Sequence, residues 1–220
     1  MRKTQQECRG NEERRPMKYR LAILCALFPA SVHAAPVAPP APPSAYSVPA
    51  GAVVVSTGSQ LAAELAKTTP RDIVLRDGTY TAASFFSSAC GHRIYAQNLG
   101  RAVLTSGLSI GSDGCGEGAI VRGLSFAITD PKKAVVSWTP VSANDTSVIE
   151  TWGGARRARL LDISIAGNRV VGAGITARQP EGLRIERVVA RGFRSYGIYV
   201  DADQFGLTVA TPAVLQDLTL

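Results

Sequence analysis

The sequence predicts an all-β chain wound into a coiled solenoid of parallel strands, on the strength of one repeated pattern and its spacing. The pattern is apolar, any, apolar, any, any, apolar, any, apolar, and its starts lie 39, 25 and 30 residues apart. Period two is typical of a strand with one buried face, and the extra central residue turns the chain before period two resumes. One such unit cannot bury its own apolar face, so each must stack on the next. The four copies begin at Ala119, Ala158, Leu183 and Ala213.

The first 34 residues are expected to be a leader that is removed on export. Residues 1–16 are charged and have no apolar period, so we expect Met17 to be the true start. A basic segment, the apolar run 21–28 and the small-residue site 32–34 then follow in the order of a signal peptide. The apolar run is too short to span ~30 Å of hydrocarbon at ~1.5 Å per residue, so no stable membrane insertion is expected after cleavage. The mature protein is therefore expected to be secreted, periplasmic or at the cell surface.

Net charge gives little support to nucleic-acid binding. The whole chain carries +7, but the leader holds seven Lys or Arg and three Glu, which is +4. The mature chain therefore carries 17 − 14 = +3. A nucleic-acid partner is not expected from so small an excess.

A linker and a capping helix precede the repeats. Residues 35–50 are rich in Pro and Ala, without charge or period, and are expected to form an extended tether. Residues 57–67 show a helical period and end before Pro70, and residues 72–80 read as a strand that breaks at Asp77–Gly78. A helix laid across the open apolar end of a solenoid excludes water and blocks edge-to-edge pairing.

Residues 57–65 and 71–80 resemble the capping helix and first coil of pectin-lyase-like right-handed parallel β-helix proteins. They are especially similar to the alginate lyase and chondroitinase B group, which opens with such a helix and a strand of the form GD-x-I-x-L-x-x-G-x-Y. Arg71 stands where that group has Gly. The resemblance covers residues 53–220 and implies a right-handed parallel β-helix domain over 51–220. The same opening heads lyases, epimerases, hydrolases and catalytically silent surface proteins.

Two stretches of the repeat region are irregular. The first spacing exceeds one coil, and residues 129–147 are expected to form either an extra coil or a loop. The fourth copy is completed by Leu220 with no cap after it, so we expect the β-helix to be incomplete at its C-terminus.

Cys90 and Cys115 are the candidates for a disulfide, because they lie 25 residues apart, which is one repeat length. Adjacent coils stack at about 4.8 Å, within the roughly 4.4–6.8 Å between Cα atoms that a disulfide tolerates. An exported protein is expected to form this bridge, and two buried free thiols are the alternative. No metal site is expected, because His92 is the single histidine after the leader and no CxxC occurs. No cofactor is assigned.

The candidate substrate-binding residues come from aligning Gly174 with Gly197, two glycines 23 residues apart. The alignment places an arginine over an aspartate on the outside of successive coils, with a tyrosine beside them. The arginine can pair with a uronate carboxylate, the tyrosine can offer a stacking face, and an aspartate can accept sugar hydroxyls. The alternative is a surface ion pair of about 0 to 1 kcal/mol between the arginine and the aspartate. The residues are Arg178, Tyr199, Asp201 and Asp203.

Two groups of arginines can be interpreted either as ligand contacts or as ordinary solvated surface. The run Arg156, Arg157, Arg159 is either a polyanion contact or a charged turn between coils. Four further arginines alternate with apolar residues, as on any solvated strand face. They are Arg184, Arg187, Arg191 and Arg194.

The expected function is that of a secreted carbohydrate-active protein acting on an acidic polysaccharide, as a lyase by β-elimination. Elimination needs a cation to neutralise the uronate carboxylate and a base to remove the α-proton. The resemblance implies a Lys and an Arg for these roles, but no residue here matches their positions, so the catalytic residues are unassigned. The alternative is a non-catalytic surface or adhesion β-helix that binds glycans or a protein partner.

Overall fold

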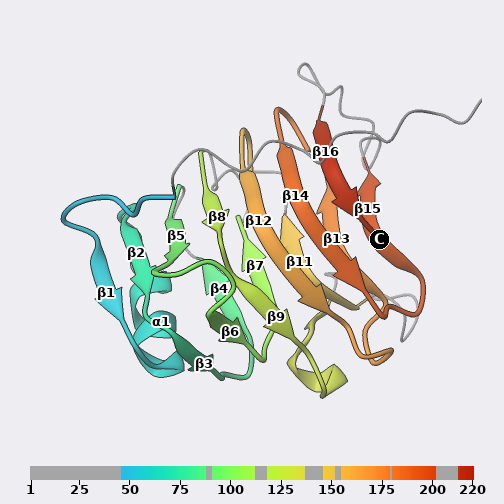
Figure 1. The fold of residues 1–220 in the computed structure, drawn as a ribbon, viewed down its shortest axis with the longest axis horizontal. Coiled ribbons are helices and arrows are strands. Elements are labelled where there is room, and N and C mark those ends of the chain that lie inside the picture. Colours follow the sequence, from blue (N-terminus) through green and yellow to red (C-terminus); the bar gives the residue numbers. More distant parts are fainter. Residues whose placement is uncertain are drawn as a thin grey trace, which may run out of the picture. The chain divides into compact units, whose positions relative to one another are not determined.

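Strands that lie far apart in the sequence stack side by side in two sheets (Figure 1). The computed structural model describes residues 46–87, 91–111, 118–136, 146–151, 155–178, 180–201 and 213–220. All of them belong to one unit, residues 40–220. Within these residues, sheet A has ten strands and sheet B has six.

Sheet A runs in the order β1-β2-β5-β8-β12-β9-β6-β3, with β14 beside β12 and β16 beside β14. Because β12 is long, its first half pairs with β8 and its second half with β9. The strands are β1 (Val53–Val55), β2 (Asp72–Leu75), β3 (Gly78–Tyr80), β5 (Arg93–Ala96), β6 (Ala102–Leu104), β8 (Ile120–Arg122), β9 (Ser125–Ala127), β12 (Arg159–Ala166), β14 (Arg184–Arg191) and β16 (Val214–Thr219).

Sheet B runs in the order β15-β13-β11-β7-β4, and β10 pairs with β11. Its strands are β4 (Phe85–Ser87), β7 (Leu108–Ile110), β10 (Val135–Val136), β11 (Thr146–Thr151), β13 (Ala173–Arg178) and β15 (Tyr196–Asp201).

The chain winds from one sheet to the other and back. From β12 to β16 each successive strand changes sheet and lands beside the strand two before it. Every described strand pair is parallel except β10 with β11. Parallel neighbours need a long crossover, and here the crossover is the strand of the opposite sheet. This is the layout of a parallel β-helix, which confirms the fold class predicted from the sequence.

The repeated apolar pattern determines which residues pair across neighbouring strands of sheet A. Leu160 pairs with Ile185 and Ile163 with Val188, so equivalent pattern positions stack coil on coil. All the apolar positions of the first three copies are buried in one core cluster between the sheets. In the fourth copy Leu215 and Leu220 are exposed, because β16 has β14 on one side and no described strand on the other.

The turn inside each copy is made by a single residue in the left-handed conformation. Gly123, Asp162, Arg187 and Asp217 occupy the same pattern position, and their φ angles are 76°, 56°, 53° and 53°. One left-handed residue redirects a strand without interrupting its pairing on either side, although a side chain there is uncommon. The polar residues at this position therefore form a column along the corner of the stack.

Helix α1 (Gly58–Leu65) covers the first coil as predicted. Its N-cap is Thr57, whose hydroxyl accepts a hydrogen bond from the Gln60 N–H. Leu61 and Leu65 enter the core, and the helix contacts β3 and β4, which are edge strands of the two sheets. A Cβ on Gly58 would lie 2.1 Å from the Thr81 carbonyl oxygen, so only glycine allows this close approach.

The irregular stretch 129–147 is only partly described. It holds the short 3₁₀ helix η1 (Pro131–Lys133), then β10, which is antiparallel to β11, and the first two residues of β11. Residues 129–136 are therefore not a parallel strand of an extra coil. Cys90 and Cys115 lie outside the described residues, so their pairing stays a prediction.

Candidate functional site

The outer face of sheet B carries two of the residues that the sequence singled out, Arg178 and Tyr199. The register pairs Thr176 with Tyr199 and Arg178 with Asp201 across β13 and β15, as the aligned segments predicted. Asp203 and the side chain of Asp201 lie outside what the structure describes. The structure thus brings the arginine and the tyrosine onto adjacent strands.

One outward column of sheet B is polar along four coils. In register it contains Ser109, Glu150, Thr176 and Tyr199. The preceding residue in each strand is Leu108, Ile149, Ile175 or Ile198, which points into the core. Ser109, Glu150 and Thr176 are nonetheless buried, and Tyr199 is exposed. Of these four positions, only that of Tyr199 therefore offers an exposed side chain to a ligand.

Glu150 is the acidic partner of Arg178. Its Oε1 lies 3.6 Å from Nε of Arg178, and the two side chains are 2% and 14% exposed. The arginine thus pairs back to the preceding coil of sheet B. Sequence reasoning missed Glu150, although a carboxylate within an otherwise uncharged strand is a signal that a cation must lie nearby.

Hydroxyl groups join the same two strands. Ser147 Oγ and Thr176 Oγ1 are 2.6 Å apart, and Thr146 Oγ1 accepts a hydrogen bond of 3.0 Å from the Gly172 N–H. These bonds satisfy buried polar groups and hold β11 and β13 in register.

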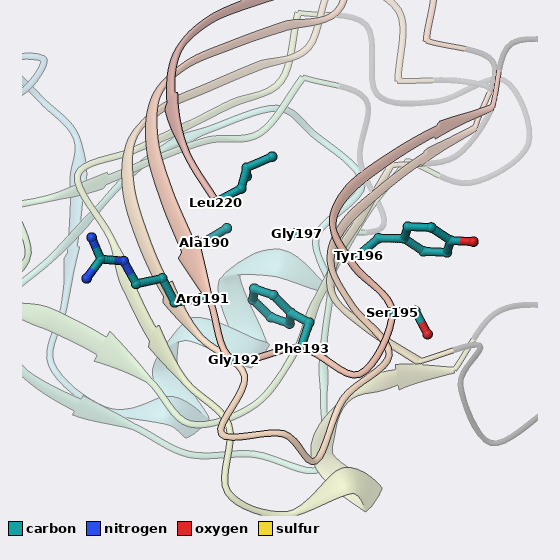
Figure 2. A pocket seen from close by; sticks show the side chains of 8 residues that line it. All are labelled: Ala190, Arg191, Gly192, Phe193, Ser195, Tyr196, Gly197 and Leu220. Carbon is teal, nitrogen blue, oxygen red and sulfur yellow. The ribbon is translucent and has the colours of Figure 1, made fainter. Parts of the chain in front are cut away.

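An exposed pair of tyrosine rings lies on β15. The ring centroids of Tyr196 and Tyr199 are 5.4 Å apart with an interplanar angle of 35°. The two residues are 56% and 38% exposed. Figure 2 shows the Tyr196 ring directed away from the interior of the coil. Sequence reasoning missed Tyr196. Side chains three positions apart on a regular strand point to opposite faces, so the sequence does not predict its contact with Tyr199.

A cavity of about 290 Å³ opens beside this strand, at the last described coil. Figure 2 shows the Phe193 ring directed between the two strands that carry Ala190 and Gly197, with Leu220 near it. The cavity has a mixed polar and apolar lining and shares no residue with the column of Ser109, Glu150, Thr176 and Tyr199. Its lining is Ala190, Arg191, Gly192, Phe193, Ser195, Tyr196, Gly197 and Leu220.

The corner of sheet A holds a second buried carboxylate. Asp162 Oδ2 lies 2.8 Å from Nε of Arg122, and its Oδ1 lies 2.5 Å from Nε of Arg187. Burial raises the pKa of Asp162, but the hydrogen bonds and charges of Arg187 and Arg122 outweigh it and hold that pKa below its usual value. Hydrogen bonding to Asp162 raises the pKa of Arg187. Each oxygen of the Asp162 carboxylate accepts a hydrogen bond from an arginine, which suits a structural role.

No metal centre is assembled by the part of the chain that the structure describes, since no three His, Cys, Asp or Glu side chains there are placed to share an ion. The same residues include no helix long and apolar enough to cross a bilayer. Comparison with protein-family models, with curated proteins and with solved structures found no match.

Proposed function

We propose that this protein is a β-helix protein of the pectin-lyase-like kind that binds an acidic polysaccharide on the outer face of sheet B. The observation that carries the proposal is the exposed Tyr196–Tyr199 pair, which lies one strand away from Arg178. Sugar rings present C–H faces that pack on aromatic rings, and an exposed aromatic pair supplies such a platform at low cost in side-chain entropy.

The acidic nature of the ligand follows from the cation beside the platform. Strands β13 and β15 are neighbours, so Arg178 lies about 4.8 Å along the stack from the strand that carries Tyr199. A sugar stacked on Tyr199 would bring a uronate carboxylate toward this guanidinium. Glu150 faces the guanidinium from the preceding coil at an ion-pair distance of 3.6 Å, and we assign it a positioning role.

Cleavage by β-elimination is the second candidate, favoured by the presence of a cation beside the platform and by the resemblance of the N-terminal cap. Elimination also needs a base within reach of the α-proton. Glu150 is shielded from solvent and already paired with Arg178, so the described face supports binding more directly than cleavage. The leader residues further lead us to propose that the protein acts outside the cytoplasm.

The test uses the full exported chain with polygalacturonate, alginate, chondroitin sulfate and a neutral glucan. We expect binding to the acidic polymers alone by affinity electrophoresis, and Y196A and Y199A each to weaken it about tenfold, a loss of ~1.4 kcal/mol. The control is V54A, which truncates an exposed side chain on sheet A. Unsaturated products detected by their ultraviolet absorbance would establish elimination, and failure to bind any acidic polymer would refute the proposal.

A further inference from the structure

We propose that Phe86 is a second aromatic contact for the polysaccharide, at the opposite end of the outward column of sheet B from Tyr199, and that the ligand is an extended chain lying along the stack of coils. The inference rests on the proposed function for the chemical class of the ligand. It adds the direction in which the ligand lies, its minimum length and one further binding residue.

Phe86 and Tyr199 belong to the same column of paired residues. The register pairs Phe86 of β4 with Ser109 of β7, and the column then continues through Glu150 and Thr176 to Tyr199. The strands that carry this column, β4, β7, β11, β13 and β15, lie side by side in this order in Figure 1. The column therefore runs from one end strand of this path through sheet B to the other.

The exposed side chains of this column are those at its two ends. Phe86 is 49% exposed and Tyr199 is 38% exposed, whereas the three residues between them are buried. Phe86 points outward because side chains alternate along a strand, and its neighbour Phe85 lies in the core. The column thus offers an aromatic ring at each end and polar side chains that project little between the rings.

The distance between the two aromatic residues determines the length of the ligand. Four strand spacings separate β4 from β15, so the Cα atoms of Phe86 and Tyr199 are about 19 Å apart. An extended chain of linked pyranose sugars advances by about one strand spacing per sugar, so a ligand that packs on both rings needs about five sugars. A disaccharide reaches one ring at a time.

The two ends of the column differ in chemistry. Tyr199 lies on the strand next to Arg178, so a sugar packed on this ring lies beside a cation. Phe86 lies three strands away from the strand of Arg178, and its side chain has no polar atom. It can pack on the C–H face of a sugar without contacting a carboxylate. Phe86 is therefore expected to add affinity for long chains rather than preference for acidic ones.

The test compares short and long ligands with the full exported chain. The probes are disaccharides and octasaccharides prepared from polygalacturonate, alginate and chondroitin sulfate, and binding is measured by titration calorimetry, with displacement of the octasaccharide for the weaker ligands. F86L removes the ring and keeps an apolar side chain. We expect F86L to weaken octasaccharide binding about fivefold and to leave disaccharide binding unchanged, whereas Y199A weakens both.

Two further variants separate a ligand contact from an effect on folding. F86Y keeps the ring and should bind the octasaccharide as the wild type does. V54A, which truncates an exposed side chain on sheet A, should change neither affinity. Octasaccharide binding lost in F86L and retained in F86Y would support the inference. An equal loss in F86L and F86Y would show that position 86 acts through packing and would overturn it.

The remaining outcomes distinguish this inference from the proposed function. An F86L loss of equal size for both ligand lengths, or no loss for either, would overturn the inference while the wild type still binds. Failure of the wild type to bind any of the acidic octasaccharides would refute the proposed function and this inference with it.

Discussion

The Asp162 carboxylate of β12 receives the Arg187 guanidinium of β14 at 2.5 Å and the Arg122 guanidinium of β8 at 2.8 Å. Asp162 and Arg187 occupy the same position of the repeated pattern, and both are in the left-handed conformation. In these two coils the residue that makes the turn thus also binds one coil to the other. Together with Arg122, this pair joins three neighbouring strands of sheet A by charge-assisted hydrogen bonds.

Replacing Asp162 by Asn should destabilise the protein by about 2–4 kcal/mol, because two part-buried arginines lose their shared counter-charge while the side-chain shape is kept. Urea unfolding followed by circular dichroism measures the change. The control is E181Q, which removes the part-exposed partner of the exposed Arg156 and should cost less than about 1 kcal/mol. Equal losses in the two variants would contradict a special role for the corner.

The same pair predicts how stability depends on acid. The folded pKa of Asp162 is lowered, so its contribution is complete above the unfolded value of about 3.9 and is lost as pH falls through the folded pKa. The stability difference between wild type and D162N should therefore be constant near neutrality and shrink below about pH 4. A stability difference between wild type and D162N that grows as the pH falls would contradict this prediction.

The Tyr46 hydroxyl should lose its proton at a higher pH than an ordinary tyrosine. Burial raises its pKa to about 12, against the opposing charge of Arg122 and with smaller increases from Asp162 and Tyr95. Its hydroxyl donates to the Ala96 carbonyl, and its ring lies 4.9 Å from the Arg122 guanidinium. Because the folded pKa is raised, the contribution of protonated Tyr46 to stability is complete below the unfolded pKa of about 10. It is lost as pH rises through about 12.

An alkaline ultraviolet titration of wild type and Y46F tests this assignment. The difference between the two curves should show one tyrosine with a midpoint near 12. Y46F should also lose about 0.5–1.5 kcal/mol, the usual contribution of one hydrogen bond. A difference curve centred near 10 would mean that Tyr46 is solvated.

Gly58 controls the seating of the capping helix. An added Cβ would lie 2.1 Å from the Thr81 carbonyl oxygen, so G58A must displace α1 or the start of the loop after β3. We expect a loss of about 1–3 kcal/mol and more binding of a hydrophobic dye, because Leu61 and Leu65 would be partly uncovered. The exposed neighbour change S59A should have no measurable cost. A neutral G58A would show that α1 is not packed on this coil.

The core positions of sheet A were predictable because period two and one extra residue determine which side chains face inward. Leu160, Ile163 and Val188 could be assigned to a shared interior without knowing the length of each coil. Helix α1 was predictable from its apolar face and Thr57 cap, within two residues at each end.

The ion pairs were not predictable, because each depends on the coil length between its members. Arg122 and Asp162 are 40 residues apart, and Asp162 and Arg187 are 25 apart, so one uniform period finds only one of them. Glu150 reaches Arg178 diagonally across strands, which a residue-on-residue alignment does not reveal. The antiparallel β10 carries only two residues and gives no periodic signal.

The winding itself is tested most directly by a cross-link between coils. Ser125 and Ser164 pair in register across β9 and β12, 39 residues apart in sequence, and both face away from the core. Their Cα atoms, about 4.8 Å apart, suit a disulfide, whereas Val189 lies one strand further on and is about 10 Å from Ser125. Mild oxidation and peptide mapping should show the cross-link in S125C/S164C and not in S125C/V189C. Absence of the first cross-link, or equal yields of both, would contradict the stacked coil.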